Sequence, residues 1–233
     1  MASILGMPDA PPAADAPLTA AVAGALEGRA LLTHPFYQRW EAGQLLEGEL
    51  SEYAANYRAF EATLPAVLSD VARRLRTEGE DEAAAMVERN LADELGRPEP
   101  HLTLFDRFAE GLAGESTAPS PGPAARALVA TYRDLVARGP VHALAGLAAY
   151  ETQAAAIAAS KAEGLRRWYG MDADGTEFWD VHATMDADHG EWTIEALAAL
   201  GADPSDVGEA ARRGADAWWA FLDEREAEAR QPV

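Results

Sequence analysis

The chain has 233 residues, of which 19 are basic and 39 are acidic, so its formal net charge is −20. Such an acidic chain gains nothing by releasing counterions from DNA or RNA and is repelled by anionic membranes, which disfavours both kinds of partner. The sequence contains no cysteine, so disulfides, iron–sulfur clusters and cysteine nucleophiles are excluded, and His, Asp and Glu remain as metal ligands.

The first 17 residues carry four prolines and lack the basic and apolar regions of a signal peptide. No later run of apolar residues is long enough for a membrane-spanning helix. We therefore expect a disordered leader over residues 1–17 and one cytoplasmic domain over residues 18–233. The 48% hydrophobic composition is typical of a globular fold.

The periodicity of the remaining chain is helical almost throughout. Apolar residues recur three or four positions apart, as at Leu50, Tyr53 and Tyr57, and the alternation of a β-strand is missing. Pro65 should kink the third predicted helix, and residues 114–123, rich in Pro, Ser and Gly, should form a loop. We expect one all-α bundle of about seven to eight helices. In chain order, the helices cover residues 18–32, 49–76, 81–95, 101–112, 124–137, 141–169, 176–200 and 204–229, and a short helical piece covers residues 34–40.

The segment predicted over residues 176–200 carries His182, Asp186 and His189 at positions i, i+4 and i+7. At about 100° per residue, these side chains share one face of a helix. Two imidazoles and a carboxylate on one face suit a divalent metal such as iron or manganese. Taken alone, the pattern fits two half-buried histidines beside a solvated aspartate at least as well, so the metal hypothesis needs further donors.

Three other residues are candidates for the same site. Glu94 and His101 are seven positions apart, but the prolines between them interrupt any helix, so the pair lies across a break. Glu151 is the one charged residue in positions 139–160, and a carboxylate in so apolar a stretch is costly unless it is paired or bound to metal. Each of these three residues could instead be an ordinary residue on the surface or at a helix end, with no role in binding metal. A site of three carboxylates and three imidazoles would suit two metal ions and dioxygen chemistry or hydrolysis. Because the sequence has no Glu-x-x-His, a ferritin-type cage is disfavoured.

At these residues the sequence resembles the haem-oxygenase-like di-iron oxidases, and within them the CADD-like branch, which is related to the TenA and PqqC families. The likeness covers nearly the whole chain after the leader. The resemblance implies a haem-oxygenase-like bundle with a dinuclear metal centre. The matching stretches are residues 34–40, 53–57, 90–94, 98–101, 149–153, 161–165 and 181–189. The metal ligands that the resemblance implies are Glu94, His101, Glu151, His182, Asp186 and His189.

Members of the CADD-like branch are understood to make para-aminobenzoate for folate synthesis from parts of their own chain. By this resemblance Tyr37 would supply the ring and Lys161 the amino group, and Tyr53 falls on a nearby tyrosine of the family. The assignment would explain why Lys161 is the only lysine, whereas the other 18 basic residues are arginine. Lys161 follows Glu151 by about 15 Å along a helix, which places it outside a metal's first shell. Without the resemblance, both tyrosines fit ordinary core packing and the lysine fits a side chain that extends to water.

The sequence departs from the family pattern beside the implied ligands. Leu95 follows Glu94 where most relatives carry an acidic residue, and Ala183, Thr184 and Ala187 replace acidic residues between the last ligands. Such neighbours orient ligands, so the departures concern the surroundings of the metal. His34 and His142 begin helical segments and receive no ligand role.

These observations favour an O2-dependent oxygenase that uses two iron ions, or iron plus manganese, and an external reductant. A self-sacrificing synthase of this kind would turn over once. A second hypothesis keeps the metal centre but gives it an external small substrate, such as a fatty acid or an amino acid, and a third is a helical interaction protein without stoichiometric iron. A thiaminase of the TenA type is nearly excluded, because its nucleophile is a cysteine and this chain has none. A cofactorless oxidase of the PqqC type is disfavoured, because it does not need six metal ligands. The sequence does not decide whether the chain forms a homodimer.

Overall fold

The computed structural model describes residues 15–96, 99–112 and 121–229. Within these ranges the chain forms ten α-helices and one short 3-10 helix, without a strand, so the predicted all-α class is confirmed. Most of the predicted leader and of the predicted loop over residues 114–123 lie outside the described residues. The elements are α1 (Ala16–Ala25), η1 (Leu31–Thr33), α2 (Pro35–Glu41), α3 (Glu47–Glu61), α4 (Leu64–Glu78), α5 (Asp81–Gly96), α6 (His101–Gly111), α7 (Pro123–Arg138), α8 (Pro140–Tyr169), α9 (Ala173–Ala199) and α10 (Pro204–Ala229).

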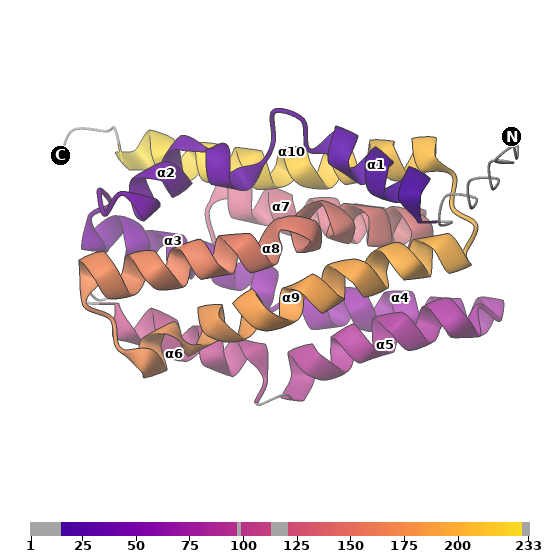
Figure 1. Ribbon diagram of the computed structural model, residues 1–233, viewed down its shortest axis with the longest axis horizontal. Helices are drawn as coiled ribbons and strands as arrows, with labels where there is room; N and C mark the ends of the chain where they lie inside the picture. Colours follow the sequence, from indigo (N-terminus) through magenta and orange to yellow (C-terminus); the bar gives the residue numbers. More distant parts are fainter. Residues whose placement is uncertain (1–14, 97–98, 113–120, 230–233) are drawn as a thin grey trace, which may run out of the picture.

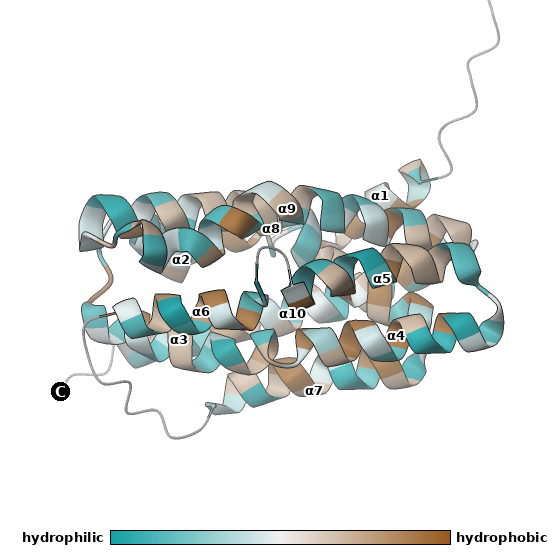
Figure 2. Cartoon of the chain, turned by 90° about the horizontal axis from the view of Figure 1, so that it is seen from below, coloured by the Kyte–Doolittle hydropathy of each residue, from teal (hydrophilic) through white to brown (hydrophobic). Residues whose placement is uncertain are grey.

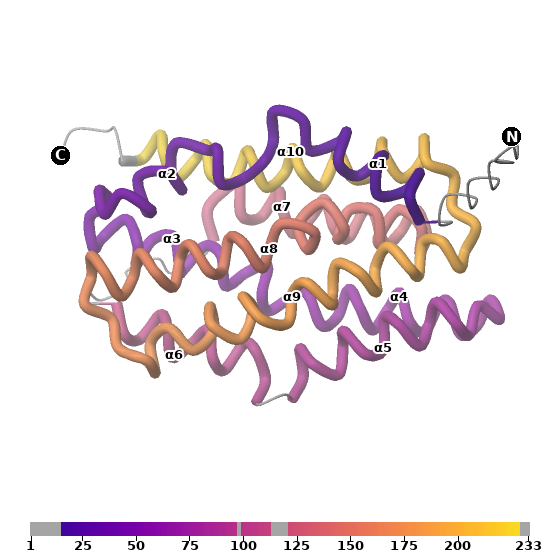
Figure 3. Tube along the Cα trace, viewed as in Figure 1, coloured from indigo at the N-terminus to yellow at the C-terminus, as the bar shows by residue number. Residues whose placement is uncertain are grey.

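The helices lie side by side along the long axis of the molecule (Figure 1). α8 packs against α9 over much of its length and also contacts α10 and α7, so it is the central helix. α1 and α2 both lie along α10, as the trace in Figure 3 makes clear. α5 and α6 pack on the other side of α9. This arrangement directs side chains of α3, α5, α6, α8 and α9 toward a common interior.

Most helices carry hydrophilic and hydrophobic residues on different parts of their surface (Figure 2). Their apolar residues form one buried cluster, which includes the fully buried rings of Trp40, Tyr53, Tyr57 and Trp179. Large aromatic rings dominate the burial in such a core. In the described part of the chain, no helix is both long enough and apolar enough to cross a membrane.

The helix predicted over residues 49–76 is two helices. α3 ends at Glu61 and α4 begins at Leu64, with Pro65 in its first turn. Proline fits there because it lacks the N–H that a helix interior needs, so the chain starts a new helix rather than kinking the old one. This division, together with the short α2, gives more helices than the seven to eight expected. It also places Glu61 at the end of α3, in the interior of the bundle.

His34 begins α2, as expected of a residue without a ligand role. Its Nδ1 accepts a hydrogen bond from the Phe36 N–H at 3.1 Å, and its Nε2 lies 3.1 Å from Oδ1 of Asp223 on α10. Because Nδ1 is an acceptor, the proton resides on Nε2 and the ring is neutral. Burial lowers the pKa of His34, which favours that neutral form. The cap therefore fixes the start of the helix that carries Tyr37.

Candidate functional site

Six residues predicted to bind metal converge on the interior from four helices. Each is at least nine-tenths buried. α5 supplies one carboxylate, α6 one imidazole, α8 one carboxylate and α9 the other three side chains. In chain order they are Glu94, His101, Glu151, His182, Asp186 and His189. The spacing on α9 had indicated one shared face, and the three side chains do face inward together.

Two of the three histidines and Glu94 form the first half of this cluster. Nδ1 of His101 lies 3.1 Å from Oε2 of Glu94, and the rings of His101 and His182 have centroids 4.4 Å apart. Apart from this contact of Nδ1 with Glu94, the ring nitrogens of His101 have no hydrogen-bond partner, although the residue is fully buried. Such nitrogens are costly to bury unless a ligand satisfies them.

The structure adds Glu61, which sequence reasoning missed. One donor atom from each of Glu61, Glu94, His101 and His182 lies within 4.8 Å of the others. Burial raises the pKa of Glu61 well above its ordinary value, and the nearby carboxylates of Glu94 and Asp186 raise it further. The available signal was the spacing from Tyr53, since Tyr53, Tyr57 and Glu61 at i, i+4 and i+8 share one face of α3.

Glu151 and His189 belong to the second half of the cluster. The Glu151 carboxylate accepts hydrogen bonds from Asn90 at 2.8 Å and Thr193 at 2.5 Å. Burial raises the pKa of Glu151 to about 7, although the nearby His189 opposes that rise. Nδ1 of His189 lies 3.4 Å from Oδ1 of Asp186. Gly190 makes this packing close, because a Cβ there would meet the backbone of Glu151 at 3.3 Å.

The hydrogen bonds of the two α9 imidazoles orient them for binding a cation. Nδ1 of His182 donates to the carbonyl oxygen of Phe178 at 2.7 Å, which leaves Nε2 with a free lone pair. Nε2 of His189 lies 3.4 Å from Asp93, and its other ring nitrogen, Nδ1, faces Asp186 in the cluster. Imidazoles that bind metals are commonly held in this way through their second nitrogen.

The cluster surrounds a small cavity of about 20 Å³. A space of this size holds roughly one water molecule. Carboxylates and imidazoles are the donors that suit iron and manganese, and unpaired donor atoms remain on His101 and Glu61. The residues present therefore fit metal ions better than an organic ligand. The departure at Leu95 leaves the cluster untouched, because that side chain is 55% exposed.

Lys161 lies in a second interior site, which we call the aromatic cage. Its side chain is 2% exposed, so the reading in which it extends to water is wrong. The Nζ atom donates a hydrogen bond to the Tyr53 hydroxyl at 2.6 Å and lies 4.6 Å from the centre of the Tyr37 ring. The Tyr53 and Tyr37 hydroxyls are 2.8 Å apart. The rings around Nζ are those of Tyr37, Trp40, Tyr53, Tyr57 and Trp179.

The cage favours an uncharged amine. Burial lowers the pKa of Lys161 well below its ordinary value, and the more distant carboxylates of Asp186 and Glu61 offset this only in part. Burial likewise raises the pKa of Tyr37, which keeps its phenol protonated. A neutral amine thus lies beside a neutral phenol.

Tyr57 connects the two sites. It lines the cavity of the donor cluster, and its ring centroid is 5.5 Å from that of Tyr53 in the cage. Its hydroxyl is 2.8 Å from that of Tyr150, which precedes Glu151 and lines the same cavity. Lys161 is therefore one tyrosine away from the cluster rather than a member of it, as the helix rise had predicted.

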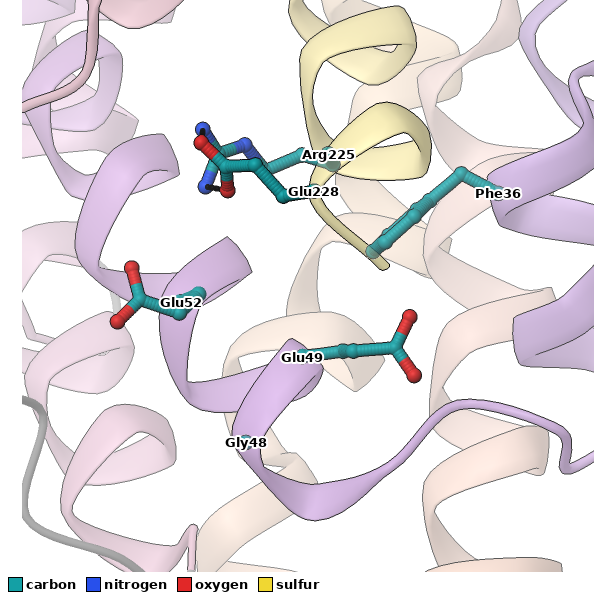
Figure 4. Close-up of a pocket in the computed structure, with 6 residues that line it drawn as sticks. All are labelled: Phe36, Gly48, Glu49, Glu52, Arg225 and Glu228. Carbon is teal, nitrogen blue, oxygen red and sulfur yellow. Dashed lines mark hydrogen bonds and ion pairs between the residues drawn. The ribbon is translucent and has the colours of Figure 1, made fainter. Parts of the chain in front are cut away.

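Phe36 closes the cage on the side of the molecular surface. Its ring stacks on that of Tyr53, with centroids 5.5 Å apart, and its other side borders a pocket of about 150 Å³ (Figure 4). Glu49, Glu52 and the ion pair of Arg225 with Glu228 form the rest of the wall. A single aromatic ring thus separates Tyr53 from an acidic surface pocket.

Known proteins resemble this chain over most of its length. Residues 51–219 match the model of a protein family that is described as iron-containing redox enzyme and is named after haem oxygenase. A 4-aminobenzoate synthase from Nitrosomonas europaea is 36% identical over 212 residues, which cover 85% of this chain and 86% of that protein. One from Chlamydia muridarum is 30% identical over 208 residues, covering 85% of each chain.

Solved structures share the fold at lower identity. A CADD-like protein of unknown function from Nostoc punctiforme superposes with a TM-score of 0.75 at 20% identity, covering 93% of this chain and 99% of that one. A TenA homologue from Pseudomonas syringae gives a TM-score of 0.73 at 16% identity, covering 92% and 91%. These similarities bear on the fold alone, whereas the synthases bear on the family.

Proposed function

This chain belongs to the iron-containing redox enzyme family with the haem-oxygenase-like fold, and we propose that it makes 4-aminobenzoate from its own Tyr37 and Lys161 at a dinuclear metal centre. The relatives named 4-aminobenzoate synthase support the product. The donor cluster supports the metal centre, with Glu94, His101, Glu151, His182, Asp186 and His189 as ligands. Two iron ions, or one iron and one manganese, fit these donors.

The observation that carries the proposal is the position of the Lys161 amine. Its nitrogen lies 4.6 Å from the centre of the Tyr37 ring inside a closed aromatic cage. An ammonium ion has no lone pair and cannot attack a ring, but burial lowers the pKa of this amine and thereby favours its neutral form. A nucleophilic nitrogen is thus held beside an aromatic carbon skeleton.

The product defines what must happen to Tyr37. Its para C–O bond is replaced by a C–N bond with the oxygen lost as water, the Cα–Cβ bond breaks, and Cβ is oxidised to a carboxylate. The Cε–Nζ bond of Lys161 must also break, so that the nitrogen leaves with the ring. Metal ions in this centre would supply the oxidising power, with O2 as the oxidant and an external reductant as electron donor. The Tyr53 hydroxyl holds the Lys161 amine and the Tyr37 hydroxyl together, because it forms a hydrogen bond with each of them. Tyr57 and Tyr150 place aromatic rings between the donor cluster and the cage.

The size of the cavity argues for a substrate within the chain. The donor cluster encloses about 20 Å³, which has no room for a fatty acid or an amino acid. One observation favours an external substrate instead. A groove of about 440 Å³ between α8 and α9 reaches Glu151 past Ala155, Ala187 and Gly190. Neither Lys161 nor Tyr37 borders this groove.

Intact-mass spectrometry separates the two functions. Purified protein is loaded with iron, or iron and manganese, and given a reductant and O2. Self-sacrifice predicts at most about one 4-aminobenzoate per chain, with a loss of mass that maps to Tyr37 and Lys161. An unchanged chain mass with continuing product formation would instead require an external substrate. Chains that receive metal without O2 are the control.

A further inference from the structure

Glu61 is the buried carboxylate that the six proposed ligands leave unexplained. It is 2% exposed, and its Oε1 atom has no hydrogen-bond partner within the described part of the chain. A carboxylate without a partner in a protein interior is costly in its charged form. Either it stays protonated as a structural residue, or a cation satisfies it.

The surroundings of Glu61 favour a cation. Its donor atom lies within 4.8 Å of donor atoms from Glu94, His101 and His182. Nε2 of His101 also lacks a hydrogen-bond partner, and His182 Nε2 is left free by the bond from Nδ1 to Phe178. Unsatisfied donors from α3, α6 and α9 thus surround one point. A single divalent ion would satisfy all of them, whereas a proton on Glu61 would satisfy one.

We propose that Glu61 is a seventh protein ligand, which completes a four-donor position with Glu94, His101 and His182. The inference rests on the proposed dinuclear centre and deepens it. Glu151, Asp186 and His189 then hold the second ion with three protein donors. Iron and manganese accept up to about six donors, so a position with four protein donors leaves fewer places for water or a small ligand than one with three. The second position is therefore where small molecules exchange, and the first retains its ion longest.

The place of Glu61 on α3 links this ligand to the cage. Tyr57 and Tyr53 precede it by one and two turns on the same helix face. An ion bound at Glu61 would fix the end of α3, just before the break at residues 62–63. Metal binding would thereby also fix the helix that carries the Tyr53 hydroxyl.

Titration with Mn²⁺ of the metal-free protein tests the inference. Wild type should bind two ions per chain. Glu61→Gln should weaken one of them at least about tenfold, because removal of even a ligand's supporting group has that effect. The metal-free variant should melt no lower than wild type, since a neutral amide removes a buried ionisable group. Glu52→Gln is the matched control, because Glu52 is on the same helix but faces the surface pocket of Figure 4.

Two ions bound by Glu61→Gln with wild-type affinity would overturn the inference. If that variant fails to fold, a crystal structure of the wild type soaked in Mn²⁺ decides. A Glu61 oxygen within about 2.0–2.4 Å of an anomalous manganese peak supports the ligand role, and one beyond about 3 Å rejects it.

The result is separable from the proposed function. A wild-type chain that binds two Mn²⁺ ions but yields no 4-aminobenzoate with any metal would refute the synthase and leave the ligand role standing. A wild-type chain that binds neither Mn²⁺ nor Fe²⁺ would refute both.

Discussion

The donor cluster and the aromatic cage are neighbouring interiors with opposite electrostatic character. The cluster gathers carboxylates and imidazoles and leaves donor atoms of His101 and Glu61 unsatisfied. The cage surrounds one amine with five rings and gives it a hydroxyl partner rather than a carboxylate. The first environment therefore stabilises added positive charge, whereas in the second burial lowers the pKa of the amine. Tyr57 is the boundary between them, so a single ring separates the donor cluster from the amine.

A permanent positive charge in the cage should have the largest effect on stability, because it removes the difference between the cage and the donor cluster. Lys161→Arg introduces a guanidinium, which cannot lose its proton at accessible pH. An uncompensated buried charge costs about 3–5 kcal/mol, so the free energy of unfolding should fall by that amount. Urea denaturation measures it. Because this variant is destabilised, it is a poor test of nitrogen donation.

Lys161→Met is the better variant for that purpose. It has a comparable length and no charge, so its stability should equal or exceed that of wild type while product is lost. A stable, charged Lys161→Arg chain with full product yield would contradict both the cage and the donor role.

Metal binding should stabilise the fold equally whether or not the cage contains its lysine. At about 100 times the dissociation constant, an ion contributes roughly 2.7 kcal/mol per site. We expect the same gain in wild type and in Lys161→Met, because the lysine lies outside the donor cluster. Thermal melts with and without Mn²⁺ measure the gain. A smaller gain in Lys161→Met would mean that the two sites are energetically coupled.

The smallest predicted effect is a pH dependence of stability that comes from the cage. The unfolded chain keeps the lysine proton up to its ordinary pKa of about 10.4, whereas the folded chain has lost it at lower pH because burial depresses the pKa. Between these values the unfolded state binds more protons. Stability should therefore rise with pH, by at most about 1.4 kcal/mol per pH unit from this group.

Subtracting the profile of Lys161→Met isolates the effect. The measurement should be made between about pH 8 and 9.5. Because burial raises the pKa of Tyr37, this phenol lowers the stability of the fold only above the ordinary tyrosine pKa of about 10. Parallel profiles for the two proteins would show that Lys161 stays charged in the cage.

The sequence predicted the parts of this site that depend on local spacing. His182, Asp186 and His189 share a helix face by arithmetic, and the apolar setting of Glu151 indicated an inward carboxylate. Glu61 was missed because an acidic side chain in the middle of the helix predicted over residues 49–76 has the sequence signature of a surface residue. Its burial depends on α3 ending at residue 61 and on side chains of α5, α6 and α9 that reach that end.

For Lys161 too, the sequence predicted part of its setting and missed the rest. Lys161 was noticed because it is the only lysine in the sequence, and the helix rise placed it away from the donor cluster, whose cavity it does not line. Whether its amine points to water or inward depends on α2, α3 and α9, which contribute the rings around it. Contacts between segments so distant along the chain leave no periodic signal in any one of them.

The burial of the chain's only lysine makes Lys161 a reporter of native-state opening. An acylating reagent attacks neutral amines, and burial favours the neutral form of this ε-amine while leaving it only 2% exposed. Its labelling rate therefore measures how often α2 or α3 lifts away from α8, as hydrogen exchange does for a backbone amide. No other lysine competes for the label, so one peptide mass records the frequency of that local unfolding.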